Sequence, residues 1–389
     1  MKGFIYDIPT KVYFGDKIKG NLGAELSKFG KKVLLVYGGG SIKKSGLYDT
    51  VKKEIENNNI ELYELSGVEP NPRVTTVNLG AEICRSNNIE VILAVGGGSV
   101  IDCAKVIGAA ALTKNDAWDL VIGKVKAKGC LPIITVLTMA ATGTEMNFNA
   151  VISNQKTEEK IGYKYPPLRP KVSFLDPKNT FSVSSYQTAC GGADILSHIM
   201  EDYFCTDGNM YLLDSFMEGL MKTVIKYTPV AMKEPNNYEA RANLMWASSW
   251  ALNGMIRGGK VHAWSCHSME HQLSAVYDIT HGLGLAILTP RWMEYVLDDA
   301  TVHRFYSFGV NVFGIDSNLD KIKVGRLAIE KLKDFLFNQC KLSSTLTKIG
   351  IDDTHFEKMA EKAVAYNDYK IAFKNLKVID VINIYKNCL

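Results

Sequence analysis

The sequence predicts an α/β domain over residues 1–180 and an all-helical domain over residues 181–389. In the first part, short apolar runs alternate with segments of helical spacing, and glycine-rich turns close two of these runs. After Pro177, apolar residues recur three and four positions apart and almost no strand-like alternation remains. A chain of 389 residues also exceeds the size at which single cores usually stop growing, so two domains are expected.

Five apolar runs in the first part are predicted to be β-strands. They cover residues 31–37, 60–66, 91–95, 132–138 and 172–176. Between them, helices are expected around Val51, around Leu79 and from Val100 onward. Continuous apolar strands that alternate with helices are typical of a parallel sheet covered on both faces. In the second part, helices are expected within residues 184–204, 210–230, 238–257, 264–276 and 324–338.

The composition narrows the class of protein. The formal net charge of +4 comes from scattered Lys and Arg residues, which favours a mixed solvated surface over nucleic-acid binding. The eight cysteines form no C-x-x-C pair, so reduced and mostly buried thiols are expected. The opening MKGFIYDIPTKVYFG lacks the apolar core of a signal peptide, and no run approaches the roughly 20 apolar residues of a membrane span. We therefore expect a cytoplasmic protein.

The run VILAVGGGSVIDCAK indicates a phosphate-binding turn. A buried strand leads into three glycines, and a helix is expected to begin at Ser99 or Val100, with Ser99 as its N-cap. Glycines let a phosphate approach the backbone, and a helix N-terminus offers unpaired N–H donors. Because neither G-x-G-x-x-G nor a Walker A motif is present, a tight turn without a ligand stays open as the alternative.

A second GGGS sequence follows the first predicted strand and bears on the choice of coenzyme. In NAD-binding sheets, an acidic residue near such a strand end often binds the ribose 2′-hydroxyl. This chain instead has Gly39, Gly40 and Ser41 there, with Lys43 and Lys44 just beyond. A hydroxyl and cations without a carboxylate favour a 2′-phosphate and hence NADP(H), although such lysines also suit a solvated helix start.

A third segment, TVLTMAATGTEM, follows the fourth predicted strand. It places Thr138, Thr142 and Thr144 around a glycine. Hydroxyl groups and backbone amides in such a turn are suited to hold a pyrophosphate or a nicotinamide amide.

Histidines are concentrated in one stretch of the helical part, VHAWSCHSMEHQLSAVYDITHG. This stretch contains four of the seven histidines, namely His262, His267, His271 and His281. Far upstream, Asp194 precedes His198 by four residues, a spacing that puts both side chains on one helix face. Imidazoles with one carboxylate suit a divalent metal such as zinc or ferrous iron. We expect Asp194, His198, His267 and His281 to bind it, and His271 to be a fifth ligand, an outer partner or a proton relay.

Other interpretations of this cluster stay open. The histidines can be core or capping residues that bind no metal. The segment from His267 to His271 also matches H-x-x-E-H, a peptidase pattern in which both histidines bind zinc and Glu270 activates water, but this leaves Asp194 and both GGGS turns unexplained. Four nearby apolar residues suit either a substrate pocket or ordinary helix packing. These are Trp246, Trp250, Met255 and Trp264.

Taken jointly, motifs along nearly the whole chain resemble those of the iron-containing (group III) alcohol dehydrogenases, especially the bacterial NAD(P)H-dependent butanol dehydrogenases. The motifs include IPTKVYFG, VYGGGSIKKSG, SGVEPNPR, VGGGSVIDCAK, TMAATGTEM, GGADILSHIMEDYF and WSCHSMEHQLSAVYDITHG. The resemblance implies the architecture shared with dehydroquinate synthase: a dinucleotide-binding α/β domain, a helical metal-binding and substrate domain, and an active site between them. It also implies hydride transfer between NADPH and an aldehyde, one Fe²⁺ or Zn²⁺, and a homodimer or larger homo-oligomer.

The resemblance also carries over roles for individual residues. It assigns the metal to the same four residues, and it places His271 near the nicotinamide as a catalytic candidate. For the coenzyme it implies Gly39 and Ser41 near the adenosine ribose, Asn71 near the adenine, Gly97, Gly98, Ser99 and Asp102 at the pyrophosphate, and Thr138, Thr142, Asn147 and Lys160 toward the nicotinamide and its ribose. His262 is an extra histidine without an assigned role. Glycerol dehydrogenases, sugar-phosphate cyclases and non-catalytic nucleotide-binding proteins stay open as alternatives.

Overall fold

The computed structural model describes residues 3–206, 210–260 and 263–389, which form two compact units. The sheet unit comprises residues 7–183 and 235–249, and the helical unit comprises the remaining described residues. The sequence predicts one domain boundary near residue 180. In the structure, residues 235–249 return to the sheet unit from within the second half of the chain.

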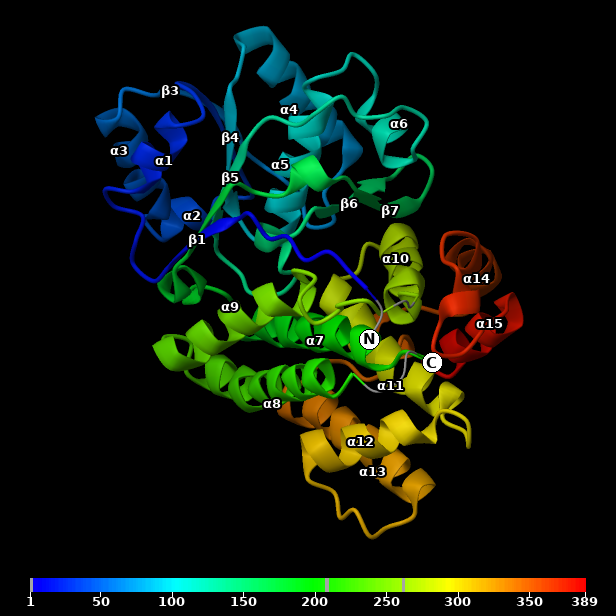
Figure 1. Ribbon diagram of the computed structural model, residues 1–389. Helices are drawn as coiled ribbons and strands as arrows, with labels where there is room; N and C mark the ends of the chain where they lie inside the picture. Colours follow the sequence, from blue (N-terminus) through cyan, green and yellow to red (C-terminus); the bar gives the residue numbers. More distant parts are fainter. Residues whose placement is uncertain (1–2, 207–209, 261–262) are drawn as a thin grey trace. The chain divides into compact units, whose positions relative to one another are not determined.

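The sheet unit contains a six-stranded parallel sheet in the order β1–β8–β5–β4–β2–β3 (Figure 1). Its strands are β1 (Lys11–Phe14), β2 (Lys32–Tyr37), β3 (Glu61–Leu65), β4 (Val91–Gly96), β5 (Ile133–Leu137) and β8 (Val172–Leu175). The five predicted strands are therefore confirmed. Three further strands are not predicted: β1, and the hairpin of β6 (Asn149–Asn154) and β7 (Glu159–Lys164). Their mixed exposure gives no continuous apolar run.

Both faces of this sheet are buried, because alternate residues of a strand enter different cores. Leu34 and Ile92 pack in the core under α4 and α5, whereas Val33 and Leu93 pack in the core under α1 and α3. Figure 1 shows these helix pairs on opposite sides of the strands. The helices are α1 (Leu22–Ser27), α3 (Leu47–Asn57), α4 (Val74–Asn87) and α5 (Gly98–Ala110). The predicted two-sided α/β arrangement is confirmed.

The helical unit confirms the prediction that helices replace strands in the second part of the chain. Its long helices are α7 (Ser185–Tyr203), α8 (Tyr211–Lys233), α10 (Ser265–Tyr277), α11 (His281–Val296), α12 (Val302–Phe313), α13 (Lys321–Lys333), α14 (Phe356–Ala365) and α15 (Val378–Lys386), while α9 (Tyr238–Leu252) belongs mostly to the sheet unit. Helix α7 packs against α8 and α11, and α10 packs against α11. This packing places α7, α10 and α11, which carry the predicted metal ligands, beside one another.

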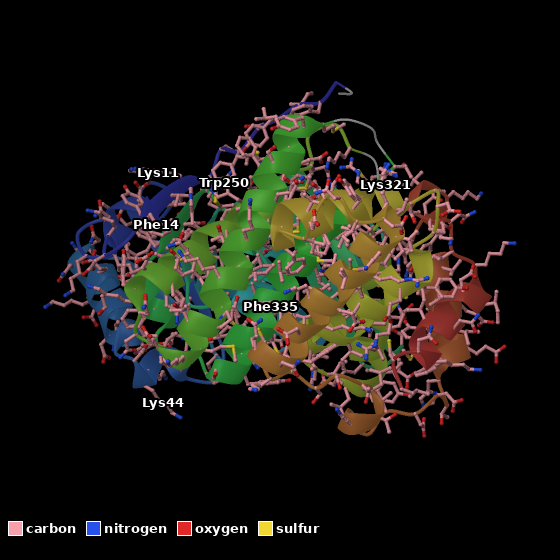
Figure 2. All side chains as sticks on the ribbon, turned by 90° about the horizontal axis from the view of Figure 1, so that it is seen from below. Lys11, Phe14, Lys44, Trp250, Lys321 and Phe335 are labelled. Atoms are coloured by element: carbon pink, nitrogen blue, oxygen red, sulfur yellow. The ribbon has the colours of Figure 1, made fainter. Side chains whose placement is uncertain are left out.

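An aromatic core stabilises the helical unit. The Phe204 ring lies 4.9 Å from the Phe305 ring and 5.5 Å from the Phe308 ring, measured between centroids. Phe335, labelled in Figure 2, is also buried.

All eight cysteines are free, and Cys130 alone among them is not fully buried. Among the described helices, we find no segment with the length and apolar character that crossing a membrane requires.

Candidate metal centre and coenzyme-binding edge

The first two predicted metal ligands lie on a buried face of α7. Ser184 begins this helix as its N-cap, accepting a hydrogen bond from the backbone N–H of Gln187. Asp194 and His198 follow one turn apart, with Asp194 Oδ1 3.6 Å from His198 Nε2. Both side chains are buried. The predicted sharing of one helix face is confirmed.

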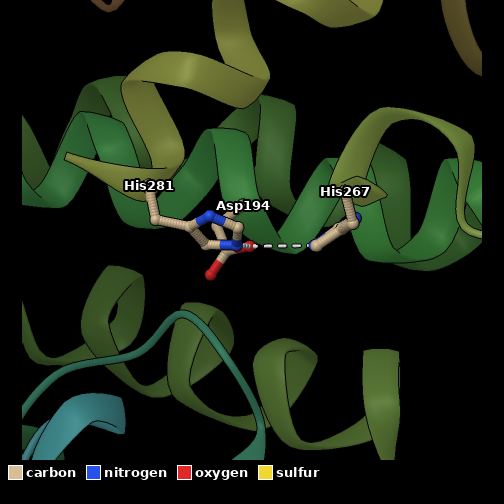
Figure 3. Close-up of side chains that lie close together, drawn as sticks. All are labelled: Asp194, His267 and His281. Carbon is tan, nitrogen blue, oxygen red and sulfur yellow. Dashed lines mark ion pairs between the residues drawn. The ribbon is translucent and has the colours of Figure 1, made fainter. Parts of the chain in front are cut away.

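The other two predicted ligands approach the same carboxylate oxygen from α10 and α11. Asp194 Oδ1 lies 3.7 Å from His267 Nε2 and 3.5 Å from His281 Nε2 (Figure 3). His281 reaches this position because a sharp turn separates the two helices. Asp278 ends α10 with a φ of 50°, and His281 is the first residue of α11.

The arrangement fits a divalent metal ion. Separations of 3.5–3.7 Å are long for hydrogen bonds. These three distances from Asp194 are close to the roughly 3.4 Å expected between ligand atoms around a tetrahedral ion with bonds of about 2.1 Å. The ligand atoms of Asp194, His267 and His281 lie within 4.8 Å of one another, and His198 is tied to them by its 3.6 Å distance to Asp194. Asp194 Oδ1 and His267 Nε2 are also buried without a hydrogen-bond partner among the described residues, and buried polar atoms are normally paired. An ion bound by these atoms would satisfy both.

Burial and mutual charge set the protonation of this cluster. Burial alone raises the pKa of Asp194, but the His198 and His281 imidazoles outweigh it and hold this pKa well below its ordinary value. Burial lowers the pKa of His198 to about 3, so this imidazole is neutral, as a metal ligand must be. Burial also disfavours charge on His267, but the Glu201 and Asp194 carboxylates outweigh it and raise its pKa to about 9. Metal binding at His267 therefore displaces a proton at neutral pH.

Two further predicted residues border the cluster. The His271 ring centroid lies 6.3 Å from that of His267 and 5.7 Å from that of His281. The Trp264 ring meets the His198 and His267 rings edge-on, at 5.9 and 5.2 Å. The catalytic role of His271 stays a prediction. His262 lies outside the described residues.

The geometry does not support the H-x-x-E-H peptidase pattern. In that pattern the glutamate must reach a water molecule at the metal. The Glu270 side chain is instead fully buried, and its carboxylate contacts His281 Nδ1 and accepts a hydrogen bond from Ser274. The Glu270 carboxylate therefore contacts the His281 imidazole and is not exposed to solvent.

Two carboxylates near the cluster are missing from the sequence-based site. Glu201 contacts His267 Nδ1, and Glu270 contacts His281 Nδ1. Glu201 follows His198 by three residues on the same helix, a spacing that signals proximity. No local spacing relates Glu270 to His281, because the turn between α10 and α11 creates that contact.

Three predicted coenzyme segments follow neighbouring strands of the parallel sheet. The neighbouring strands β2, β4 and β5 are parallel, so the segments that follow them emerge at the same edge. In open α/β sheets, ligands bind at this carboxyl edge. After β2, Gly40 adopts a φ of 105° before the short helix α2 (Ser41–Lys44). Figure 2 shows Lys44 pointing outward, and the Lys43 ammonium lies 4.9 Å from the centre of the Tyr48 ring.

The turn after β4 differs in one detail from the prediction. Helix α5 begins at Gly98 with Gly97 as its N-cap, so the prediction of Ser99 as N-cap is wrong. Gly97 takes this position because its extended backbone leads directly from the strand into the helix, which leaves Ser99 inside the first turn. A Cβ atom on Gly98 would lie 2.5 Å from Thr142 Oγ1. The segments that follow β4 and β5 therefore meet here without space for a side chain.

A buried polar network holds α5 to the segment that follows β5. Asp102 accepts hydrogen bonds from Thr144 Oγ1 (2.5 Å) and from the backbone N–H of Val151 (2.9 Å). Lys105 Nζ donates to Thr144 Oγ1 (2.6 Å) and to Asn147 Oδ1 (3.0 Å). Burial raises the pKa of Asp102 and lowers that of Lys105 to about 8. Lys105 is absent from the sequence-based site, and coenzyme contact by Asp102 and Asn147 stays a prediction.

Asn71 and Lys160 are two other predicted coenzyme residues. Asn71 has a φ of 53° in the loop between β3 and α4, a left-handed conformation that asparagine tolerates. Lys160 is buried on β7. Their predicted places near the adenine and the nicotinamide ribose stay predictions.

Residues 9–177 match the model of the family "Iron-containing alcohol dehydrogenase", and residues 188–389 match "Fe-containing alcohol dehydrogenase family, C-terminal". The chain belongs to the iron-containing alcohol dehydrogenase family. The family resemblance and the fold class inferred from sequence are thereby confirmed.

Known relatives cover the chain almost completely. It is 51% identical over 387 residues to NADH-dependent butanol dehydrogenase A of Clostridium acetobutylicum, with 99% of both chains covered. It is 34% identical to an NADPH-dependent aldehyde reductase of Escherichia coli, with 93% of both covered. The solved structure of NADH-dependent butanol dehydrogenase A from Thermotoga maritima is similar with a TM-score of 0.94 at 38% identity, covering 100% of this chain and 99% of that one.

Proposed function

We propose that this protein is a metal-dependent alcohol dehydrogenase that interconverts short-chain aldehydes, such as butyraldehyde, and primary alcohols with NADPH. The observation that carries the proposal is the convergence of three imidazole Nε2 atoms on one buried Asp194 oxygen. Butanol dehydrogenases and an aldehyde reductase among the relatives support the substrate class. In this proposal the sheet unit binds the dinucleotide, and the helical unit binds the metal and the substrate.

The residues of the cluster have separate roles in the proposed reaction. Asp194 provides an anionic oxygen, and His198, His267 and His281 provide neutral nitrogens to hold Fe²⁺ or Zn²⁺. When bound, the metal supplies Lewis-acid polarisation of a carbonyl oxygen and the reduced nicotinamide supplies the hydride. We assign to His271 the holding and release of the proton that the alcohol product needs. The Trp264 ring packs edge-on against the His198 and His267 imidazoles.

Substrate comparison tests the proposed reaction class. Protein reloaded with Fe²⁺ or Zn²⁺ is supplied with NADPH and butyraldehyde and, in the reverse direction, with NADP⁺ and either butanol or glycerol. Change in absorbance of the reduced nicotinamide is recorded. We expect turnover with butyraldehyde and butanol. Preference for glycerol would identify a polyol dehydrogenase instead, and coenzyme binding without turnover on any substrate would identify a non-catalytic nucleotide-binding protein.

We propose that the coenzyme binds at the carboxyl edge of the sheet with its 2′-phosphate near Gly39, Gly40 and Ser41. The absence of an acidic side chain and the presence of Lys43 and Lys44 support NADPH. The names of the butanol dehydrogenases at 51% identity support NADH instead. NADH and NADPH therefore have to be compared on this protein. A substitution at Gly39 tests directly whether the 2′-phosphate binds there.

The variant Gly39→Asp is expected to shift the coenzyme preference toward NADH. Apart from the chain neighbours of Gly39, no atom of the described residues lies within 4 Å of a Cβ placed on it, so the carboxylate fits without strain. Like charges cost several kcal/mol when they are brought together, so kcat/KM for NADPH should fall at least about tenfold while that for NADH is retained. Steady-state kinetics with both coenzymes measures this. The uncharged Gly39→Asn variant is the control, and an equal loss in both variants would contradict a charge effect at the 2′-phosphate.

We also propose a cytoplasmic homodimer. The eight free cysteines support a reducing compartment. The homodimer follows from the family resemblance, and light scattering of the purified protein tests it.

A further inference from the structure

Two buried glutamates contact the outer nitrogens of two proposed metal ligands. Glu201 Oε2 lies 2.9 Å from His267 Nδ1, and Glu270 Oε2 is in hydrogen-bond contact with His281 Nδ1. In both rings the opposite nitrogen, Nε2, faces Asp194 Oδ1. Each imidazole therefore stands between a carboxylate on one side and the proposed metal position on the other.

This arrangement selects the tautomer that a metal needs. A neutral imidazole carries one proton, and a carboxylate can only accept it. A glutamate at Nδ1 therefore keeps the proton on Nδ1 and leaves the Nε2 lone pair directed at the metal position. The negative charge also makes the ring a stronger donor, and such outer partners fix the orientation of metal-bound histidines.

Both glutamates are themselves held in place. Besides His267, Glu201 accepts hydrogen bonds from the backbone N–H groups of Cys266 and His267 in the first turn of α10. Glu270 accepts a hydrogen bond from Ser274 on the same helix. A Cβ atom on Gly284 would lie 2.8 Å from Glu270 Cγ, so the glycine provides the space that this side chain occupies.

The third imidazole lacks such a partner. His198 Nδ1 is buried and has no hydrogen-bond partner among the described residues. Its position follows from the α7 backbone, on which Asp194 lies one turn away. The two imidazoles that contact a glutamate are therefore His267 and His281, which lie on two separate helices, α10 and α11.

We propose that Glu201 and Glu270 are positioning residues that orient His267 and His281 and strengthen their binding to the metal, an inference that rests on the proposed metal centre. The carboxylates do not contact the reacting atoms in this proposal. They set the proton position, the ring angle and the donor strength of the two imidazoles.

The test measures metal binding without catalysis. Wild type, Glu201→Gln and Glu270→Gln are stripped of metal and titrated with Zn²⁺ in competition with a chromophoric chelator, and the visible absorption of bound Co²⁺ is recorded. We expect about 10- to 100-fold weaker Zn²⁺ binding in each variant and a shifted Co²⁺ absorption band, because outer partners of metal-bound histidines contribute on that scale. Glu218→Gln is the control, since Glu218 is a hydrogen-bonded carboxylate whose partners are Tyr203 and Asn311.

Each outcome separates the positioning role from the metal centre itself. If both Gln variants bound Zn²⁺ with wild-type affinity and had an unchanged Co²⁺ band, the positioning role would be overturned, but the proposed metal centre would not be. If wild type bound no metal, the centre would fall, and the positioning role with it. Glu201→Asp and Glu270→Asp keep the charge and serve where a Gln variant does not fold. A folded Asp variant with weaker Zn²⁺ binding than wild type and a shifted Co²⁺ band would support the role, because the shorter side chain draws the carboxylate back from Nδ1. An Asp variant that binds both ions as wild type does would overturn it.

Discussion

Replacing Asp194 with Asn is expected to remove metal binding and to lower the kcat/KM of aldehyde reduction by at least about 1,000-fold. The substitution keeps the shape of the side chain but removes the one anionic ligand that three imidazoles face. Lewis-acid polarisation contributes several kcal/mol, and each 1.4 kcal/mol corresponds to a factor of ten in rate. Metal analysis of the purified variant and steady-state kinetics measure the two effects.

The Asp194→Asn experiment needs a control for charge loss in general. Asp299→Asn makes the same substitution at an exposed position of the helical unit and should retain metal and activity. Coenzyme binding, measured by nicotinamide fluorescence, should persist in both variants because the proposed coenzyme residues belong to the sheet unit. An Asp194→Asn variant that retains both metal and turnover would contradict the assignment of this carboxylate.

Replacing Gly282 with Ala is expected to disturb the metal centre through packing rather than chemistry. A Cβ atom on Gly282 would lie 2.1 Å from the backbone oxygen of Cys190, so α11 cannot keep its place against α7. His281 directly precedes Gly282, and Asp194 lies one turn beyond Cys190. Overpacking typically costs about 1–3 kcal/mol, so we expect a lower free energy of unfolding and weaker metal binding together. Urea denaturation and Zn²⁺ competition measure them.

Gly219→Ala is the matched control for Gly282→Ala. Gly219 lies within α8, and, outside the backbone of its own helix and its chain neighbours, no atom of the described residues lies within 4 Å of a Cβ placed on it. Alanine is favoured over glycine in a helix interior by up to about 1 kcal/mol, so this variant should gain stability and bind metal normally. A Gly282→Ala protein as stable as wild type would show that the two helices can separate without cost.

Much of the architecture follows from local patterns. The strands β2, β4 and β5 are continuous apolar runs because both of their faces are buried, and such runs can be recognised from the sequence. Strand β1 and the β6–β7 hairpin are partly exposed and lack that signal. The return of residues 235–249 to the sheet unit is likewise a tertiary feature, since that segment has ordinary helical spacing.

The same distinction applies to the candidate site. Asp194 and His198 share a helix, so their spacing of four predicts their proximity, and the structure places them 3.6 Å apart. Glu270 contacts His281 only because the turn after α10 reverses the chain, and no spacing rule anticipates that contact. The N-cap of α5 depended on backbone geometry, in which Gly97 took the position expected of Ser99.

The most direct test of the central claim is a metal titration of the stripped protein with activity as the readout. Fe²⁺ or Zn²⁺ is added in steps to protein freed of metal by a chelator, and butyraldehyde reduction by NADPH is measured at each step. A metal-dependent alcohol dehydrogenase should be inactive at the start and gain activity in proportion to added metal until one ion is bound per chain. Full turnover in the metal-free protein would contradict the proposed mechanism.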